Sequence, residues 1–215
     1  MKYSLIVFDW DGTLIDSAGG IVHCIQSAAR DLGLAVPERS RASHVIGLGL
    51  ADSLRYAVPG LPAERYTEFA AQYRKHYLAL QDSMLLFPGV LNLLESLAGE
   101  RRLAIATGKS RKGLDRALQF ENLGRFFSAS RCADETHSKP HPAMLLELME
   151  ELDVEAGSVL MVGDTSHDLD MAKAAGVDAL AVTYGAHPEQ GLRACGPLDC
   201  VPDVSSLSEW LTKNG

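Results

Sequence analysis

Hydrophobic residues near the start of the chain form a continuous run instead of an alternating pattern. Residues 3–9, YSLIVFD, predict a strand that is buried on both faces. The spacing then becomes helical: residues 17–32 carry apolar side chains three or four positions apart, with Asp16 or Ser17 as the expected cap and Gly33 as the end. Prolines separate three further predicted helices, over residues 38–46, 50–57 and 63–80.

From Phe87 onward, strand patterns alternate with helical ones. Predicted strands cover residues 102–106, 126–129, 158–162, 178–182 and 199–201. Predicted helices cover residues 89–99, 110–119, 141–152, 166–175 and 205–213. This alternation predicts an α/β fold, in which a doubly wound parallel sheet is covered by helices on both faces.

The all-helical stretch interrupts this alternation directly after the first strand. We therefore expect an inserted helical cap domain, residues 16–83, and an α/β core domain made of residues 1–15 and 84–215. In open parallel sheets the functional site lies at the carboxyl ends of the strands. The polar residues that follow each predicted strand are thus the candidates for chemistry.

Composition and charge narrow the possible partners. Hydrophobic residues make up 47% of the chain, and the net charge is −8. Such a charge argues against nucleic acid or an anionic membrane as a partner. No apolar run approaches the roughly 18 residues of a membrane span, and aspartates interrupt the short apolar N-terminal run, so we expect a cytoplasmic protein with free thiols. An anionic substrate would need positive charge close to its site.

Four polar segments follow predicted strands or precede a predicted helix. They read DWDGT (9–13), TGKS (107–110), SKP (138–140) and GDTSHD (163–168). Asp9 and Asp164 end two buried strands and offer a hard divalent cation such as Mg²⁺ two carboxylates. Lys139 would make the same edge attractive to phosphate. Together these residue types favour phosphoryl transfer.

Thr107 and Gly108 suit the binding of phosphate oxygens. Thr107 offers a hydroxyl, and the amides of the following two residues lie at a predicted helix start, where anions bind favourably. Gly108 has no side chain to keep a ligand away from its backbone.

These four segments, in this order, resemble the motifs of the haloacid dehalogenase-like (HAD) hydrolases, and the helical insertion is similar to the small cap of their phosphoglycolate phosphatase-like branch. The resemblance covers nearly the whole chain and implies a Rossmann-like core. It also implies that Asp9 is the nucleophile and forms an aspartyl-phosphate, while Asp11 acts as general acid and base. Lys139 would bridge Asp9 and the phosphate, and Thr107 and Gly108 would bind its oxygens. The implied Mg²⁺ ligands are Asp9, the Asp11 carbonyl, Asp164 and Asp168, the last of which could instead orient Lys139.

Several reactions occur in this family, and three residues distinguish them. Asp11 argues against a dehalogenase, which lacks the second aspartate. Sugar phosphomutases are similar in the first motif and the cap, but this chain has Ile21 where they carry a catalytic histidine and Leu50 where they carry an arginine. The favoured function is hydrolysis of a small, phosphoglycolate-like phosphate monoester. A phosphomutase, a pyrophosphatase or a non-catalytic ligand-binding protein remain the alternatives.

The predicted cap contributes two further expectations. Gly47 and Gly49 lie in a glycine-rich loop that would face the substrate, although glycines can equally serve a tight turn. A stripe of aromatic residues in helix 63–80 is expected to form the cap core, or else a dimer contact: Tyr66, Phe69, Tyr73 and Tyr77. We expect a monomer or weak homodimer that acts on a small phosphorylated metabolite.

Overall fold

The computed structural model describes residues 2–80 and 83–214. Its centre is a six-stranded sheet in the order β3-β2-β1-β4-β5-β6, with every pair of neighbouring strands parallel. The strands are β1 (Leu5–Phe8), β2 (Arg102–Thr107), β3 (Ala129–Cys132), β4 (Val159–Gly163), β5 (Asp178–Val182) and β6 (Cys200–Val201). The predicted α/β class with a doubly wound parallel sheet is confirmed.

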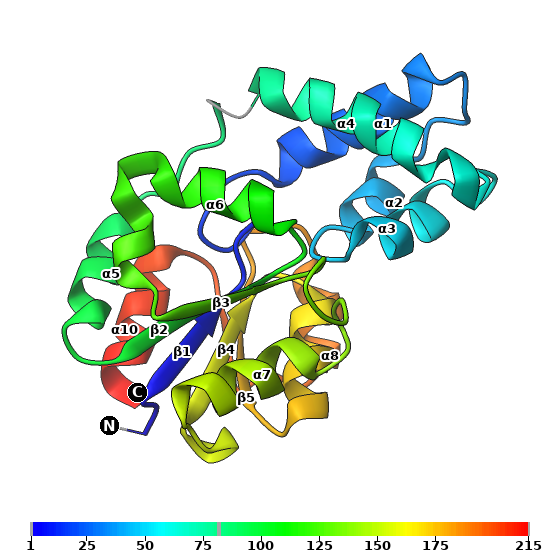
Figure 1. The fold of residues 1–215 in the computed structure, drawn as a ribbon. Coiled ribbons are helices and arrows are strands. Elements are labelled where there is room, and N and C mark those ends of the chain that lie inside the picture. Colours follow the sequence, from blue (N-terminus) through cyan, green and yellow to red (C-terminus); the bar gives the residue numbers. More distant parts are fainter. Residues whose placement is uncertain (1, 81–82, 215) are drawn as a thin grey trace.

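Alternate residues of the strands pack on opposite faces of this sheet. Ile6 and Phe8 point into one core, with α5 (Val90–Ala98), α6 (Arg111–Gln119) and α10 (Val204–Asn214). Leu5 and Val7 point into the other, with α7 (Ala143–Leu152) and α8 (Ser166–Ala175). Because both faces are covered, β1 reads as a continuous apolar run (Figure 1).

The predicted strand over residues 126–129 is misplaced. A 3-10 helix, Phe120–Phe126, ends at the first residue of that stretch, and β3 begins at its last residue, Ala129. Its register puts Ala104 opposite Ala129 at the edge of the sheet, where three of the four β3 residues are only partly buried. An edge strand has little apolar signal, so its position was the hardest to predict.

The helices of the predicted cap are α1 (Ala18–Asp31), α2 (Arg39–His44), α3 (Leu50–Ala57), the 3-10 turn Ala63–Arg65 and α4 (Tyr66–Leu80). Their apolar side chains form a third core of their own. Figure 1 shows these helices above the end of the sheet at which the strands finish. The separate core supports the division at residues 16–83, which stays a prediction; residues 81–82 lie outside the described part of the chain.

The two connections between cap and core lie side by side. The Asp16 amide donates to the Leu85 carbonyl at 2.9 Å, and the Phe87 amide donates to the Leu14 carbonyl at 3.0 Å. This paired backbone brings the chain out of the core and back at nearly the same point. Within the described residues, no helix has the length and hydropathy needed to cross a membrane.

Candidate active site

Three carboxylates meet at the carboxyl end of the sheet. Asp9 directly follows β1, Asp164 directly follows β4, and Asp168 lies in the first turn of α8. One oxygen of each lies within 4.8 Å of the others, and all three side chains are fully buried. The parallel arrangement of β1 and β4, in which Phe8 pairs with Val162, puts the two strand ends next to each other.

A buried lysine joins two of these carboxylates. Lys139 Nζ lies 2.6 Å from Asp9 Oδ1 and 2.6 Å from Asp168 Oδ1. Burial alone would lower the pKa of Lys139, but the Asp168 and Asp9 carboxylates hold it above its usual range. The lysine is therefore a fixed positive charge beside Asp9.

Asp9 keeps one oxygen free. Its Oδ2 is buried and has no hydrogen-bond partner among the described residues. Burial raises the pKa of Asp9 to about 7, although the Lys139 ammonium acts in the opposite direction. A buried, unpartnered carboxylate oxygen is costly by itself and fits a ligand to a cation or an atom that attacks a substrate.

Asp164 is enclosed by backbone. Its Oδ1 accepts a hydrogen bond from Thr13 Oγ1 at 2.8 Å, and its Oδ2 accepts one from the Ala186 amide at 2.7 Å. Gly12 has φ +87°, and a Cβ there would lie 2.2 Å from Asp164 Oδ2. Burial raises the pKa of Asp164 well above its usual range, with Asp9 adding to the effect. A carboxylate oxygen has two acceptor positions, so Asp164 retains capacity to bind a cation.

Asp168 has both oxygens in use. Its Oδ1 pairs with Lys139, and its Oδ2 accepts from the Thr165 amide at 3.1 Å and from Thr165 Oγ1 at 2.6 Å. The bond from the Thr165 amide, together with one from the Asp168 amide to Thr165 Oγ1 at 3.4 Å, forms the capping box of α8. The contact with Lys139 suits the expected role of orienting that lysine, and the place of Asp168 within 4.8 Å of Asp9 and Asp164 suits the expected role as a metal ligand; both roles stay predictions.

Asp11 is held by contacts that the sequence reasoning missed. Lys109 Nζ lies 2.9 Å from its Oδ1 and 2.8 Å from its Oδ2, and Ser17 Oγ donates to Oδ1 at 2.8 Å. Lys109 Nζ also donates to the Tyr77 hydroxyl of α4 at 2.9 Å. Only the backbone amide of Lys109 was expected to take part. Asp16 or Ser17 was expected to cap α1, and Ser17 is the N-cap, without a side-chain hydrogen bond to the helix. No local pattern signals these contacts, because they join four separate segments.

Thr107 and Gly108 lie at the end of β2 beneath the cap loop. Thr107 is buried, and its Oγ1 accepts a hydrogen bond from the Lys109 amide at 3.2 Å. A Cβ on Gly108 would lie 2.5 Å from the Gly47 carbonyl oxygen. Glycine at 108 thus allows close approach of the cap, in addition to the expected approach of phosphate.

The two cap glycines differ in their contacts. Gly47 has φ +90° and lies against Thr165, to which a Cβ would approach within 3.4 Å. The Gly49 amide donates to Ser138 Oγ at 2.6 Å, so it is engaged with the core. Both glycines therefore lie at the contact between cap and core, and their role in substrate binding stays a prediction.

The aromatic residues largely behave as expected. Phe69 is buried in the cap core, and Tyr66, Tyr73 and Tyr77 pack against that core. Tyr77 is also part of the site through its hydroxyl. Trp10 packs in the core of the sheet, 6.4 Å between ring centroids from Phe127, and thus points away from the carboxylates.

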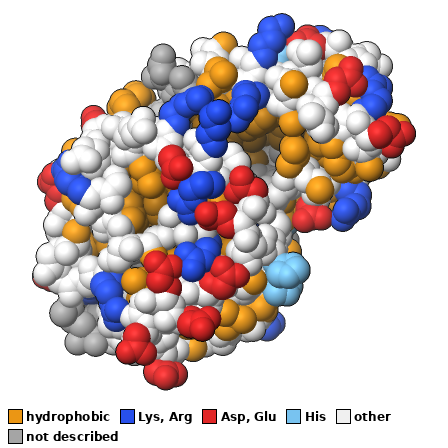
Figure 2. All heavy atoms as spheres, in the orientation of Figure 1, with side chains coloured by type: hydrophobic (Ala, Val, Ile, Leu, Met, Phe, Trp, Pro, Cys, Tyr) orange, Lys and Arg blue, Asp and Glu red, His pale blue; other side chains and the backbone are white. Residues whose placement is uncertain are grey.

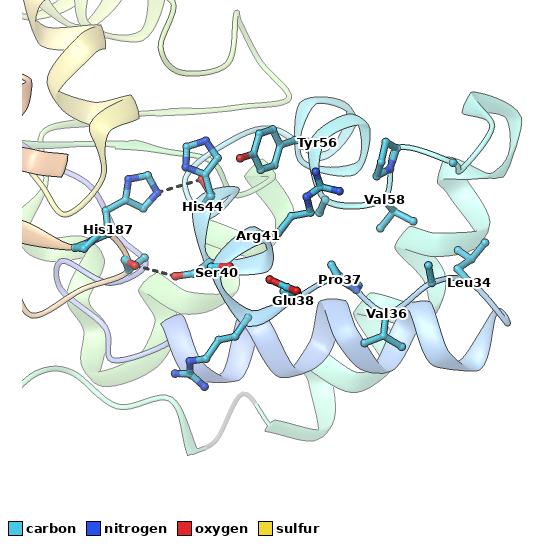
Figure 3. Close-up of a pocket in the computed structure, with 18 of the residues that line it drawn as sticks. Leu34, Val36, Pro37, Glu38, Ser40, Arg41, His44, Tyr56, Val58 and His187 are labelled. Atoms are coloured by element: carbon cyan, nitrogen blue, oxygen red, sulfur yellow. Dashed lines mark hydrogen bonds between the residues drawn. The ribbon is translucent and has the colours of Figure 1, made fainter. Parts of the chain in front are cut away.

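Three histidines, His44, His167 and His187, lie together where α2 of the cap meets the core. Figure 3 shows two of them, His44 and His187. His167 Nε2 lies 2.7 Å and His187 Nε2 3.1 Å from the carbonyl oxygen of His44, so both rings donate to it. The Ser166 amide donates to His187 Nδ1 at 3.1 Å, which leaves His187 neutral with both nitrogens engaged. Burial lowers the pKa of His187 to about 4, consistent with that state. Through these hydrogen bonds to the His44 carbonyl, the cluster attaches the cap to the core.

Two cavities adjoin the cap. One, of about 640 Å³, is lined by Asp11, Gly47, Gly108 and Lys109 together with apolar cap residues. The other, of about 1540 Å³, lies on the side shown in Figure 3, between residues 33–60 and the segment around His187. Of the residues in the four polar motif segments, only Ser166 lines the second cavity, whereas Asp11, Gly108, Lys109 and Ser110 line the first. The first cavity is therefore the one that adjoins Asp11.

Comparisons with known proteins agree with this geometry. Residues 6–182 match the family described as haloacid dehalogenase-like hydrolase. The chain is 38% identical over 210 residues to a protein named "Probable phosphatase IndB" of Dickeya dadantii, covering 94% of this chain and 91% of that protein. It is 32% identical over 225 residues to a phosphoglycolate phosphatase of Rhodospirillum rubrum, covering 96% of this chain and 90% of that protein.

A solved structure shows the same fold. The structure of a hydrolase from Pseudomonas syringae superposes with a TM-score of 0.90 at 22% identity, covering 99% of each chain. Together with the family match over most of the chain, this confirms the resemblance seen in the sequence. The chain therefore belongs to the haloacid dehalogenase-like hydrolase family.

Proposed function

We propose that the protein is a Mg²⁺-dependent phosphatase that hydrolyses a phosphate monoester through an aspartyl-phosphate. The observation that carries this proposal is Asp9, whose Oδ1 is held by Lys139 while its buried Oδ2 is unpartnered among the described residues. A nucleophile needs one anchored orientation and one free atom, and Asp9 has both. The names of the relatives, a phosphatase and a phosphoglycolate phosphatase, support the same reaction class.

Two proton transfers at Asp11 complete the reaction. An Asp9 oxygen attacks phosphorus, the ester P–O bond breaks, and the leaving alkoxide takes a proton from Asp11. Asp11, now a carboxylate, then accepts a proton from the water that attacks the aspartyl-phosphate. Phosphate leaves, Asp9 is regenerated, and Asp11 is protonated again. Lys139 offsets the negative charge that builds up on the transferring group, and Thr107 and Gly108 bind its oxygens.

The donor set suits Mg²⁺. Asp9, Asp164 and the carbonyl oxygen of Asp11 would hold it, consistent with a hard cation that takes one or two carboxylates. When bound, it would neutralise charge on the phosphate. Without a cation, burial and the neighbouring carboxylates raise the pKa values of Asp9 and Asp164, and a bound divalent ion would favour the ionised form of both.

The test is the Asp9→Asn variant assayed with p-nitrophenyl phosphate in the presence of Mg²⁺. We expect a loss of roughly 10⁴-fold or more in kcat, the scale seen when a nucleophile is removed. Asp170→Asn, an exposed aspartate of α8, is the matched control and should retain activity. Chelation by EDTA should abolish turnover, and Mg²⁺ should restore it.

Two outcomes would contradict the proposal. Asp9→Asn with wild-type kcat would exclude Asp9 as nucleophile. Transfer of the phosphoryl group from a sugar bisphosphate to a sugar, exceeding release of free phosphate, would indicate a phosphomutase. Ile21 and Leu50, which stand where mutases carry histidine and arginine, both line the cavity and offer no group for that reaction.

A further inference from the structure

The cavity beside Asp11 is large for the substrate that the resemblance suggests. Its volume is about 640 Å³, within the roughly 300–1,000 Å³ range of sites that bury drug-sized ligands. A two-carbon acid such as glycolate would fill only a small part of it. The size therefore indicates a larger organic group on the phosphate.

The walls of this cavity are mostly apolar. Side chains from three cap helices line it: Ile21 and Ile25 from α1, Leu50 and Leu54 from α3, and Phe69 and Tyr73 from α4. Figure 2 shows hydrophobic side chains along the hollow between the cap and the core. A group that leaves water for such walls gains free energy in proportion to its apolar surface.

Three of the polar side chains on the walls already form hydrogen bonds within the protein. The Tyr77 hydroxyl accepts from Lys109, Ser53 Oγ donates to the Val45 carbonyl at 3.2 Å, and Ser110 Oγ accepts from the Gly113 amide at 3.3 Å. A carboxylate or sugar hydroxyl placed among them would lose its hydrogen bonds to water and find few replacements. Such unpaired groups are disfavoured in a buried site.

Positive charge lies in exposed side chains that line the same cavity. Arg74, Lys112 and Arg116 are exposed and form no ion pair within residues 2–80 and 83–214. Lys109 is buried, but its ammonium is committed to Asp11. The lining residues that α1 and α3 contribute carry no charge, so a phosphoglycolate carboxylate placed against these two helices would have no counter-ion there.

We propose that the substrate is the phosphate ester of an apolar, ring-sized organic group that lies in this cavity against α1, α3 and α4. The proposal rests on the phosphatase function above and names the class of its leaving group. The ester oxygen lies toward Asp11, and the ring lies toward Leu50 and Phe69.

The test compares 2-phenylethyl phosphate with ethyl phosphate. Both release a primary alkoxide, so the chemical step is matched and only burial of the phenyl ring differs. We expect kcat/KM to be roughly 30-fold or more higher for the phenylethyl ester, from the transfer free energy of a buried ring. Equal kcat/KM values, or a higher value for 2-phosphoglycolate than for the phenylethyl ester, would overturn the proposal.

Leu50→Asn tests the wall itself. Leu50 is 48% exposed, so the variant should fold, and it should lower kcat/KM for the phenylethyl ester by about 3-fold or more relative to kcat/KM for ethyl phosphate. Leu146→Asn, a leucine of α7 that is 46% exposed and away from the cavity, is the control and should change neither. Equal effects of Leu50→Asn on the two esters would contradict a ring seated against α3.

Binding separates this proposal from the phosphatase function. Calorimetry measures the affinity of the cavity for 2-phenylethylphosphonate and for ethylphosphonate. Neither compound can release phosphate by ester hydrolysis, so binding is measured without turnover. Tighter binding of the phenylethyl compound supports the apolar site even if no ester is hydrolysed. The lack of hydrolysis would then count only against the phosphatase function. Equal binding, with esters hydrolysed, would overturn the apolar site and leave the phosphatase intact.

Discussion

The two aspartates after β1 are two residues apart and have different surroundings. Asp9 contacts Lys139, which is also bound to Asp168, whereas Asp11 contacts Lys109 and Ser17. Each carboxylate thus has its own ammonium group. Because each carboxylate is oriented independently, Asp9 can attack phosphorus while Asp11 donates and accepts the proton.

Lys109→Met tests whether Lys109 positions Asp11. We expect kcat/KM to fall by about 10-fold or more for an alkyl phosphate, since general acid catalysis contributes roughly 10²–10⁴-fold when the leaving group is poor. For p-nitrophenyl phosphate, whose leaving group needs little protonation, the fall should be much smaller. Steady-state kinetics with both substrates measures the difference.

The control for this variant is Lys213→Met, an exposed lysine of α10 far along the chain from the site. It should leave both substrates unaffected. Tyr77→Phe should show a weaker form of the Lys109→Met pattern, because it removes only the contact from the cap. Equal losses for both substrates in Lys109→Met would show that Lys109 does not act through Asp11.

At the scale of elements, the cap loop and the end of β2 are in close contact. The loop after α2 passes over Gly108, and the Gly49 amide reaches Ser138 beside the buried Lys139. On the other side of α2, Ser43 Oγ donates to the Ala186 carbonyl at 2.8 Å. The cap therefore contacts the core loops around the candidate site and not a remote surface.

Gly108→Ala should move the cap loop away from the core. The new methyl group would lie 2.5 Å from the Gly47 carbonyl oxygen and 2.8 Å from that of Leu48, so the backbone must shift. Such overpacking costs about 1–3 kcal/mol of the free energy of unfolding. We expect that loss in urea titrations, together with a fall in kcat/KM and faster proteolysis within residues 16–83.

Gly99→Ala is the matched control, because nothing lies within 4 Å of a Cβ at that position. It should leave stability and kcat/KM close to wild type. A Gly108→Ala variant with wild-type stability and activity would show that the contact between the loop and β2 is not held in solution.

At the scale of the whole molecule, the site places several charges in the interior. Asp9, Asp164, Asp168 and Lys139 are all fully buried. Burial raises the pKa of Asp9 to about 7 and that of Asp164 well above its usual range. The folded protein therefore binds protons more tightly than the unfolded chain, whose aspartates titrate near 4.

Stability should consequently depend on pH and Mg²⁺ together. As the pH rises from about 4 through 7, Asp9 ionises first in the unfolded chain, so folding becomes less favourable, and the penalty from Asp9 is fully present above its folded pKa of about 7. A bound divalent cation offsets that penalty. We expect Mg²⁺ to raise the Tm more at pH 8 than at pH 6, measured by calorimetry.

The control is Asp9→Asn, which removes one titrating ligand and should reduce the difference between the two pH values. A Tm increase from Mg²⁺ that is equal at pH 6 and pH 8 in the wild type would contradict the raised pKa of Asp9. An increase that Asp9→Asn leaves unchanged would place the cation elsewhere.

The net charge of −8 opposes the approach of a phosphate ester, and the exposed cations around the cavity offset it locally. We expect Arg116→Gln to lower kcat/KM by roughly 3-fold at low ionic strength, with kcat nearly unchanged. The reason is that positive charge at a cleft raises the rate at which an anionic substrate binds and does not act on the chemical step. Added salt should lower the wild-type value and reduce the difference between the two proteins. Arg30→Gln, an exposed arginine of α1 that does not line the cavity, should have no effect; an equal effect of both variants would contradict local attraction.

Much of the fold was predictable because its signals are local. The continuous apolar run of β1 reflects a strand covered on both faces, and the alternation after Phe87 reflects helices that connect parallel strands. Edge strand β3 was misplaced because half-buried residues carry a weak pattern. Ser17 was assigned to capping because a serine before a helix usually has that role, and only the fold brings Asp11 within reach of it.

The sequence by itself determined the parallel α/β class, the helical insertion after β1, and the placement of Asp9, Asp11, Thr107 and Asp164 at strand ends. These properties depend on short-range patterns, which the chain carries at each position. Only the tertiary structure decided that Lys109 and Tyr77 contact each other beside Asp11, and that an apolar cavity adjoins Asp11. Those facts depend on distances between residues far apart in the chain, such as Asp11, Tyr77 and Lys109, and no local pattern encodes such distances.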